Sequence, residues 1–356
     1  MSIETTIQTL LTQLHDPVLI KPLSEWPITP IISQEKNHLS IRLLTDFPNR
    51  FLHPLLPNLE HTIAQHLPTM SVQITLEQTI RAHRTQLPGK GLRGIKNTIA
   101  IASGKGGVGK STVAVNLATA LASAGARVGI IDADIYGPSI PLMLGKTKPV
   151  AIAGDQYLPV TTHGIQAMSI GYLTEDDPAL IWRGPMLAKS FIQMLDITRW
   201  EDLDYLIIDL PPGTGDIQLS LVQKIPLTGA VIVTTPQTVA SLDAEKAVKM
   251  FHKTHIDVLG MIENMAQHHC PHCGHTETIF GHGGALALCQ QYQCQLLGQL
   301  PLNSQIRQDC DQGTPTAAQP NNPLSPMFLK IALAMCLAIA KKPINYASQF
   351  PPIVLE

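Results

Sequence analysis

Short apolar runs alternate with helix-like segments along most of the chain after residue 95. Each run has the length of a buried strand, and the segments between the runs have the spacing of amphipathic helices. The predicted strands open at or contain Thr98, Arg127, Asp204, 229–235, Val258 and Gln295. This alternation predicts an α/β fold, a doubly wound and mostly parallel sheet with helices on both faces.

The first part of the chain has a different order of elements. Its pattern predicts a helix over 3–14, a strand over 39–45, a helix over 54–66 and a strand over 70–76. These elements predict a small α+β domain over residues 1–83. Residues 84–97 are glycine-rich and basic, which is typical of a linker, so the α/β domain is expected to occupy 98–356.

The last predicted helix follows a proline-rich stretch. Residues 315–326 carry four prolines and predict a surface loop, whereas the apolar run over 331–340 predicts a buried helix. That run is too short to span a membrane.

Composition narrows the class of protein. The chain has 356 residues, 44% of them hydrophobic, a net charge of −2 and six cysteines. Such a charge gives no general attraction to nucleic acid or anionic membranes, and the first residues lack the pattern of a signal peptide. We therefore expect a cytoplasmic protein with reduced cysteines and with neither nucleic acid nor membrane as a partner.

The strongest chemical signal lies between the first α/β strand and the helix predicted over 110–124. The segment reads Gly104, Lys105, Gly106, Gly107, Val108, Gly109, Lys110, Ser111 and Thr112. Its glycines permit positive φ and let backbone N–H groups approach phosphate oxygens. Lys110 supplies charge for the β- and γ-phosphates of ATP, and Ser111 supplies a hydroxyl for Mg²⁺. The context predicts a P-loop with phosphates at a helix N-terminus.

Carboxylates follow two other predicted strands. Asp132 and Asp134 end one strand, and Asp209 ends another, before a loop over 210–216 that is rich in proline and glycine. Parallel strands deliver such residues to one crevice, so we expect the three aspartates to converge on the phosphates and metal.

A cysteine pair gives a second chemical signal. Cys270 and Cys273 have the two-residue spacing that directs two thiolates at one metal. In a twofold dimer, two such pairs would supply four thiolates, which is the ligand set of a [4Fe–4S] cluster.

Two other interpretations of the pair remain open. A Cys₂His₂ zinc site could form within one chain with neighbouring histidines, namely His268, His269, His272 and His275. A redox disulfide between the two thiols is the third interpretation.

Five motifs occur in an order that resembles one family. They are 104–112, 132–139, Trp182-Arg-Gly-Pro185, 209–216 and Cys270-Pro-His-Cys273. Together they resemble the Mrp/ApbC family of iron–sulfur cluster carriers, which are deviant-Walker-A P-loop NTPases related to MinD and the nitrogenase iron protein. The resemblance implies that Lys105 reaches the partner's ATP across a dimer interface. It also implies that Asp134 positions the attacking water and that Asn264 contacts the adenine.

The N-terminal domain resembles, more weakly, the MIP18-like domain found ahead of such ATPases. Asp16-Pro17 stands where that domain has its opening Asp-Pro, and no cysteine precedes Cys270. Any role that needs a thiol in this domain is therefore excluded, and a docking or regulatory role is expected.

The sequence predicts a slow Mg²⁺-dependent ATPase that acts as a carrier. A homodimer binds ATP and a [4Fe–4S] cluster, receives the cluster from a scaffold donor and passes it to apo iron–sulfur proteins. The alternative function is an ATP-gated spatial organiser of the MinD or ParA type with a structural zinc site. That alternative expects a basic amphipathic helix or basic patch, which the C-terminal residues 344–356 do not offer.

Overall fold

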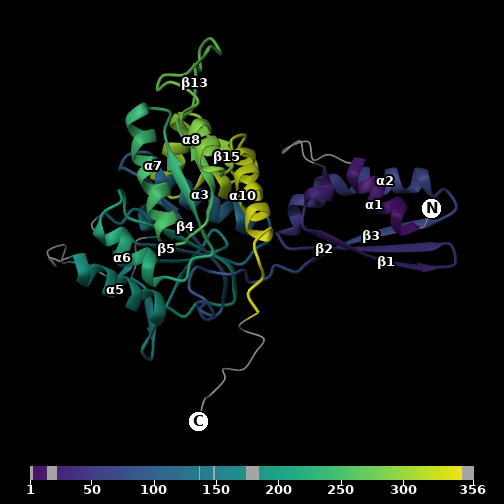
Figure 1. Cartoon of the computed structure of the whole chain (residues 1–356), viewed down its shortest axis with the longest axis horizontal. Helices are drawn as coiled ribbons and strands as arrows, with labels where there is room; N and C mark the ends of the chain where they lie inside the picture. Colours follow the sequence, from purple (N-terminus) through teal and green to yellow (C-terminus); the bar gives the residue numbers. More distant parts are fainter. Residues whose placement is uncertain (1–2, 14–21, 136, 147–148, 174–183, 347–356) are drawn as a thin grey trace.

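The computed structural model describes residues 3–13, 22–135, 137–146, 149–173 and 184–346. Some residues that the sequence analysis singled out lie outside this part of the chain, namely Asp16-Pro17, Tyr136, Trp182-Arg183 and 347–356. A small unit with a three-stranded sheet lies beside a larger unit built on an eight-stranded sheet (Figure 1).

The large sheet has the strand order β15-β12-β11-β4-β10-β5-β9-β8. Every pairing is parallel except that of β8 with β9. The strands are β4 (Ile95–Ala102), β5 (Val128–Asp132), β8 (Val160–Thr162), β9 (Ile165–Ser169), β10 (Leu203–Asp209), β11 (Gly229–Thr234), β12 (Val258–Glu263) and β15 (Leu296–Gln299). The predicted mostly parallel α/β sheet is confirmed, and β8 and β9 extend it beyond the predicted strands.

Helices cover both faces of this sheet, as predicted. One face carries α3 (Lys110–Ser123) and α10 (Ser325–Ala340), and the buried side chains of both pack in one core cluster. The other face carries α5 (Gly184–Ile197), α6 (Asp216–Lys224), α7 (Thr238–Lys253) and α8 (Gly284–Tyr292). The short helices are α4 (Ile140–Met143) and α9 (Ser304–Asp311).

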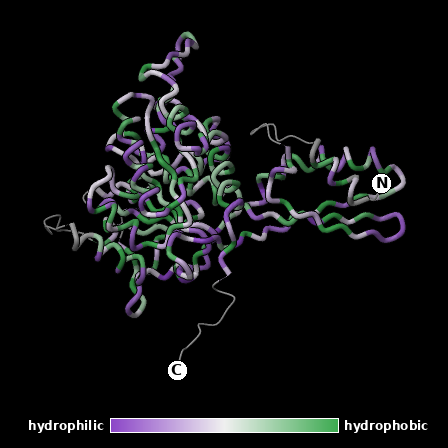
Figure 2. The backbone as a smooth tube through the Cα atoms, viewed as in Figure 1, coloured by the Kyte–Doolittle hydropathy of each residue, from purple (hydrophilic) through white to green (hydrophobic). Residues whose placement is uncertain are grey.

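Burial explains why the central strands have no polar face. All seven residues of β10 and all six of β11 are buried, because helices cover both sides of the sheet. Figure 2 shows these strands as a hydrophobic centre within more polar helices. Gly125, at φ 99°, ends α3 as predicted.

The small N-terminal unit combines a sheet with two helices. Its elements are α1 (Ile3–Gln13), β1 (Ile28–Glu35), β2 (His38–Thr45), α2 (Leu56–His66) and β3 (Ser71–Gln78). Strand β2 is central, antiparallel to β1 and parallel to β3. The sequence did not predict β1, whose side chains are at most half-buried and which contains Pro30, a residue tolerated mainly on edge strands.

Two smaller hairpins and several short turns complete the described chain. The hairpins are β6 (Ala151–Ala153) with β7 (Gln156–Leu158), and β13 (His268–His269) with β14 (Thr276–Glu277). The 3₁₀ turns are η1 (Leu23–Glu25), η2 (Asn49–Leu55), η3 (Ile170–Tyr172) and η4 (Thr316–Ala318).

The proline-rich stretch before α10 is only partly the predicted surface loop. Thr316 and Ala317 are buried in η4. The Ala317 N–H donates to Asn116 Oδ1 at 2.8 Å, and Thr316 Oγ1 donates to Asp309 Oδ2 at 2.7 Å. Because these side chains satisfy its backbone and hydroxyl groups, η4 can pack against α3.

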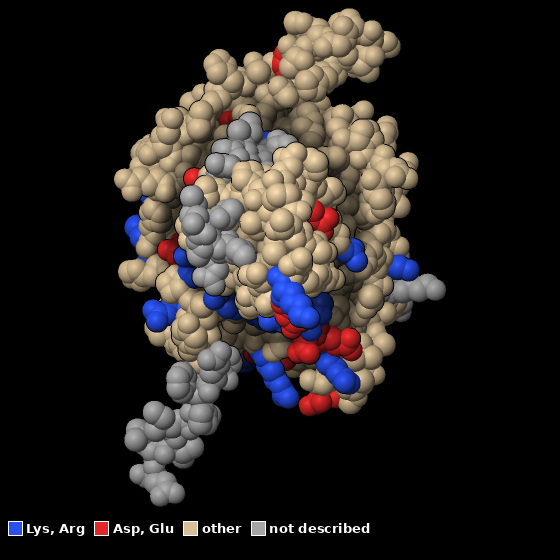
Figure 3. Space-filling model, turned by 90° about the vertical axis from the view of Figure 1, so that its right-hand side faces the viewer, with Lys and Arg blue, Asp and Glu red and all other residues tan. Residues whose placement is uncertain are grey.

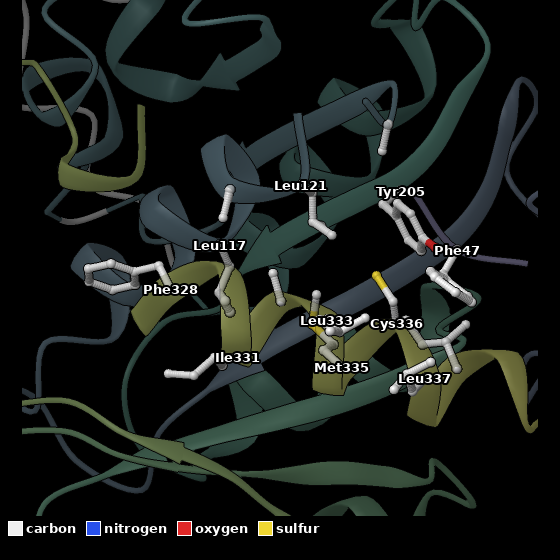
Figure 4. Close-up of a cluster of buried hydrophobic side chains, with 14 of the residues drawn as sticks. Phe47, Leu117, Leu121, Tyr205, Phe328, Ile331, Leu333, Met335, Cys336 and Leu337 are labelled. Atoms are coloured by element: carbon white, nitrogen blue, oxygen red, sulfur yellow. The ribbon is translucent and has the colours of Figure 1, made fainter. Parts of the chain in front are cut away.

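The N-terminal unit packs against the end of α3 and the side of α10. Phe47 is fully buried, and Figure 4 shows it beside Tyr205 and near Cys336 and Leu337. The Arg50 guanidinium donates to Ser123 O at 3.1 Å, and Gln78 Nε2 donates to Gly125 O at 3.2 Å. The two units therefore share one continuous hydrophobic core.

Replacing Phe47 with alanine should destabilise the chain by about 3–5 kcal/mol, the usual effect of truncating a buried phenylalanine. Urea unfolding followed by circular dichroism measures this change. Ile31→Ala in β1 is the matched control, because Ile31 is 39% exposed and should change stability by less than about 1 kcal/mol. Equal effects of the two substitutions would contradict a shared core around Phe47.

Charges are sparse on the face that carries the N-terminal unit. Figure 3 shows lysine and arginine side chains intermixed with aspartate and glutamate, with most of the surface uncharged. Among the described residues, no helix is long and apolar enough to cross a membrane.

Candidate functional site

The predicted P-loop connects β4 to α3 at the carboxyl edge of the central strands (Figure 1). Gly107 and Gly109 have φ of 82° and 80°, as expected for backbone that turns its N–H groups inward. Gly104 and Gly106 do not have positive φ, so the loop uses this conformational freedom at two of its four glycines. Gly104 is instead needed for close packing, because a Cβ there would lie 2.1 Å from the Asp243 backbone in α7.

Asn264 holds the loop from the end of β12. Its Nδ2 donates to Val108 O at 2.9 Å, and its Oδ1 accepts from the Met265 N–H at 3.0 Å. A Cβ at Gly109 would lie 2.3 Å from Asn264 Nδ2, so these two residues fit each other closely. The adenine contact predicted for Asn264 remains a prediction.

Asp209, at the end of β10, joins the two polar side chains that begin α3. Lys110 Nζ donates to Asp209 Oδ1 at 2.6 Å, and Ser111 Oγ donates to Asp209 Oδ2 at 2.5 Å. Lys110 is 6% exposed and Asp209 is fully buried. A buried carboxylate needs such a cation, because an unpaired charge in the interior is strongly unfavourable.

Asp132, at the end of β5, accepts several hydrogen bonds from the chain that follows it. Oδ1 accepts from the Asp134 N–H at 3.0 Å, and Oδ2 accepts from the N–H groups of Ser139 and Ile140 at 3.1 and 3.2 Å. Burial, followed by repulsion from Asp209, raises the pKa of Asp132 to about 7. The carboxyl therefore organises the loop after β5 and is close to its titration point near neutral pH.

This raised pKa predicts how stability depends on pH. In the folded chain Asp132 keeps its proton up to about pH 7, whereas its ordinary pKa is 3.8. The folded state binds more protons between these values, so the contribution of Asp132 to the free energy of unfolding falls as pH rises through this range.

Urea unfolding of the nucleotide-free chain between about pH 5 and 7 tests this sign. Asp132→Asn cannot titrate, so its stability should decline less with rising pH than that of the unaltered chain. Identical slopes for the two proteins would contradict the raised pKa.

The structure places the three predicted aspartates unequally. Asp209 contacts Lys110 and Ser111, and Asp132 lies in the adjacent strand, where Asp209 O accepts from the Ala133 N–H at 2.9 Å. Asp134 is half-buried and is tied to Asp132 through its backbone N–H. The loop over 210–216 reaches the P-loop strand through the Gly213 N–H, which donates to Ser103 O at 3.0 Å.

Lys105 lies on the side of the loop that faces the start of α7. Its Nζ donates to Gln237 Oε1 at 3.3 Å, and its carbonyl oxygen accepts from Ser103 Oγ at 2.9 Å. Sequence reasoning missed Gln237, because 132 residues separate it from Lys105 and no local pattern connects them. The glutamine provides a neutral partner that holds the amine without neutralising its charge.

Cys270 and Cys273 occupy the projecting hairpin labelled β13 in Figure 1. The Cys270 N–H donates to His275 O and the Gly274 N–H donates to Cys270 O, both at 2.9 Å. Gly274 has φ 72°, which closes this turn. The N–H groups of Cys273 and His272 point at the Cys270 sulfur and lower its pKa, so this turn favours a thiolate.

The hairpin supplies two sulfur ligands but no complete metal site in one chain. Cys273 is exposed and Cys270 is partly exposed. His269 Nδ1 is 2.7 Å from Thr276 Oγ1, and His268 Nδ1 is 3.5 Å from Glu277 Oε1. In the described part of the chain, no three histidine, cysteine, aspartate or glutamate residues gather to hold a metal ion. Among these described residues, the four ligands of a Cys₂His₂ zinc site are therefore not brought together within one chain.

The four other cysteines lie elsewhere in the fold. Cys289, Cys310 and Cys336 are buried, as expected for small apolar residues. Cys289 and Cys294 lie together, because the Cys294 N–H donates to Cys289 O at 3.0 Å and their thiols share a hydrogen bond.

Comparison with known proteins places most of the chain in one family. Residues 94–336 match the ParA family model described as the NUBPL iron-transfer P-loop NTPase. The iron–sulfur cluster carrier protein of Pseudomonas fragi is 51% identical over 267 residues, which cover 74% of this chain and 93% of that protein. The corresponding Escherichia coli K12 protein is 56% identical over 245 residues, which are 68% of this chain. The match covers 66% of the Escherichia coli protein, so this chain spans just under two thirds of its length.

Solved structures share the fold of the large unit. The nucleotide-binding protein of Archaeoglobus fulgidus in complex with ADP is 41% identical, has a TM-score of 0.56 and covers 62% of this chain and 88% of its own. The MinD cell-division ATPase of Pyrococcus furiosus has a TM-score of 0.52 at 23% identity, over 67% of this chain and 98% of its own, and supports the fold alone.

Proposed function

The chain belongs to the family of NUBPL iron-transfer P-loop NTPases, and from this membership we propose that it is an ATP-hydrolysing carrier of a [4Fe–4S] cluster. Two copies bind the cluster between them and pass it to apo iron–sulfur proteins. The observation that carries this proposal is the presence, in one chain, of a formed P-loop and a two-cysteine turn that supplies half of a four-thiolate site.

The P-loop side chains fit a nucleotide with a divalent cation. Ser111 and Asp209 present adjacent oxygens, which are the ligands that Mg²⁺ prefers, and they would hold the ion. Bound Mg²⁺ would neutralise charge on the phosphates. Lys110 now pairs with Asp209, and ATP would offer its ammonium group the β- and γ-phosphates instead.

Three further residues are assigned roles in nucleotide turnover. Lys105 acts on the ATP of the partner subunit, where its charge stabilises the transferring phosphoryl group. Asp134 positions the attacking water, and Asn264 contacts the adenine while it holds the loop at Val108. The hydrolysis is slow, because phosphoryl transfer here switches the geometry of the dimer.

A surface formed by α7, α8 and the loop before α8 supports the assembly of two copies. We call it the α7 face, and it consists of four exposed apolar residues, namely Val239, Leu242, Ile279 and Leu286, which are 46–64% exposed. Lys105 contacts Gln237 directly before α7, and α8 packs against α7. Exposed apolar side chains on adjacent helices are typical of an interaction surface.

The twofold symmetry of such a dimer would also complete the metal site. Each hairpin contributes Cys270 and Cys273, so two hairpins bring four thiolates to one cluster. The cluster is cargo, and the exposure of Cys273 suits a ligand that must release it. Scaffold proteins would act as donors and apo-proteins as recipients.

Transfer of the cluster tests the proposed function. The reconstituted chain is incubated anaerobically with an apo [4Fe–4S] enzyme, and recovered enzyme activity is followed with and without ATP. The proposal expects activation that depends on Cys270 and Cys273. Activation no faster than that given by free iron and sulfide would contradict a carrier role.

Replacing Lys105 with alanine should lower ATP hydrolysis by about a hundredfold or more while sparing most nucleotide binding, because its charge acts on the neighbouring site. Dimers mixed from Lys105→Ala and Lys110→Ala chains test the trans assignment. In the mixed dimer, one chain keeps Lys110 but lacks Lys105, and its partner keeps Lys105 but lacks Lys110. The one site with an intact Lys110 can therefore receive Lys105 only from the partner. Such dimers should therefore hydrolyse ATP, and failure of the mixed dimer would contradict action across the interface.

A spatial organiser of the MinD type is the second candidate function, favoured by the shared fold and the α7 face. An organiser of this kind has no use for paired cysteines on a projecting hairpin. Retention of full biological activity by Cys270→Ser and Cys273→Ser chains would favour the organiser.

A further inference from the structure

The outer edge of β15 lies in a groove that the nucleotide and cysteine sites do not use. Among the described strands, only β12 pairs with β15, so the other edge of β15 is unpaired. A groove of about 730 Å³ follows this edge from Gln295 to Gln299. Unpaired edges of this kind accept additional strands, and proteins usually cover or charge them.

Helix α10 forms the opposite wall of the groove with one stripe of its surface. Met327, Ile331, Ala334 and Leu337 line the groove at helical spacing, so this wall is apolar. Lys330 and Lys341 lie on the same stripe and are exposed. Neither lysine has a carboxylate partner within the described residues, so the rim carries positive charge that is not neutralised.

The N-terminal unit closes the groove with Trp26. The indole is 4% exposed, and its Nε1 donor has no hydrogen-bond acceptor in the part of the chain that the structure describes. A buried donor without an acceptor is unfavourable, so this end of the groove contains an unsatisfied hydrogen-bond donor. Glu25 is the one acidic residue among those that line the groove.

We propose that this groove binds an extended segment of a partner protein as a ninth strand beside β15, and that the side chains of this segment that face α10 are apolar at its centre and acidic at its two ends. Main-chain hydrogen bonds to the edge of β15 would supply affinity, and the alternation of side chains would supply specificity. On the face toward α10, the central apolar side chains pack on its apolar residues, and the carboxylates at the two ends pair with Lys330 and Lys341. The five residues that line the groove in and beside β15 span about 16 Å, the length of a short strand.

The position of the groove relates it to the cysteine hairpin. Gln267 lines the groove and directly precedes β13, which carries the chain toward Cys270. A partner held there would lie next to the hairpin, and this consequence rests on the proposed carrier function. The binding itself does not depend on that function.

Fluorescence anisotropy with a labelled peptide tests the proposal on the full chain. The probe is a peptide of about ten residues in which threonine occupies every second position, and the positions between carry glutamate near each end and valine at the centre. Its matched control has lysine in place of glutamate. The glutamate peptide should bind saturably and at least about tenfold more tightly than the lysine peptide. N-methylation of alternate peptide amides should abolish binding, because it removes donors that a strand needs.

Variants of the groove separate it from other surfaces. Ala334→Arg, which fills the groove, and the Lys330→Glu, Lys341→Glu double variant should each weaken binding by about tenfold or more. Lys224→Glu in α6, on the opposite face of the sheet, should leave binding unchanged. Iron content and ATP hydrolysis should be unchanged in all of these variants, so failure of peptide binding would not touch the carrier proposal.

Three results would overturn the inference. Absence of saturable binding, or equal binding by the Ala334→Arg chain, would exclude the groove as the site. Binding that appears only after residues 347–356 are deleted would assign the groove to the chain's own C-terminal segment, which includes Ile353-Val-Leu-Glu356. A change of oligomeric state in the double lysine variant would assign it to a second copy.

Discussion

Replacing Lys110 with alanine is expected to lower ATP hydrolysis by about a hundredfold to a thousandfold, because the phosphoryl group loses the principal side-chain charge that stabilises its transfer. Nucleotide binding should weaken as well. Isothermal titration with ATP and a steady-state assay of phosphate release measure the two effects. Equal hydrolysis rates in variant and unaltered chain, with contaminating activity removed, would contradict the P-loop assignment.

A control for folding is required, because Lys110 is also the cation beside buried Asp209. Truncation leaves that carboxylate unpaired, which destabilises a protein by about 3–5 kcal/mol in comparable cases. Lys110→Arg keeps the charge while changing its geometry. It should fold like the unaltered chain and still lose most hydrolysis, so that lost activity can be distinguished from lost structure.

Replacing either Cys270 or Cys273 with serine is the second change with a large expected effect. Each substitution leaves two thiolates per dimer, which is too few to hold a four-iron cluster stably. The variants should lose nearly all bound iron and all cluster transfer. They should keep their fold and ATP binding, because the hairpin lies outside the sheet that forms the P-loop (Figure 1).

Buried cysteines provide the matched controls. Cys289→Ser and Cys336→Ser should retain the cluster and lose only about 1 kcal/mol of stability, as expected for a small change in the core. Iron bound in full by a Cys273→Ser chain would contradict the bridging arrangement. Loss of iron in the Cys336→Ser chain would instead indicate that the assay reports unfolding.

Sequence patterns with local causes predicted much of the fold. Helix α3 was predicted over 110–124 and observed over 110–123, because its apolar composition, its P-loop start and Gly125 at its end are all contiguous. The strands that carry Asp132 and Asp209 were also predicted from local sequence, since complete burial makes the centre of each strand apolar. Edge strands such as β1 were not predicted, because their side chains are only partly buried and their sequences therefore show no clear apolar pattern.

Contacts between distant residues could not be predicted. Nothing near Lys105 in the sequence indicates Gln237, and nothing near Gly104 indicates that the α7 backbone fills the space where a side chain would lie. The motif predicts Asp132 only as a carboxylate of the phosphate site, and it gives no sign of the three backbone hydrogen bonds by which this residue organises the following loop. Tertiary packing determines these roles, and a local sequence motif does not indicate which distant residues pack against it.

The central claim is that two copies of the chain share one cluster through Cys270 and Cys273. Anaerobic reconstitution with iron and sulfide, followed by light scattering of the separated species and analysis of iron, sulfide and zinc, tests it most directly. The account predicts a dimer that holds four iron and four sulfide per two chains, with no zinc. Stoichiometric iron in a monomer, or zinc bound in place of iron, would contradict it.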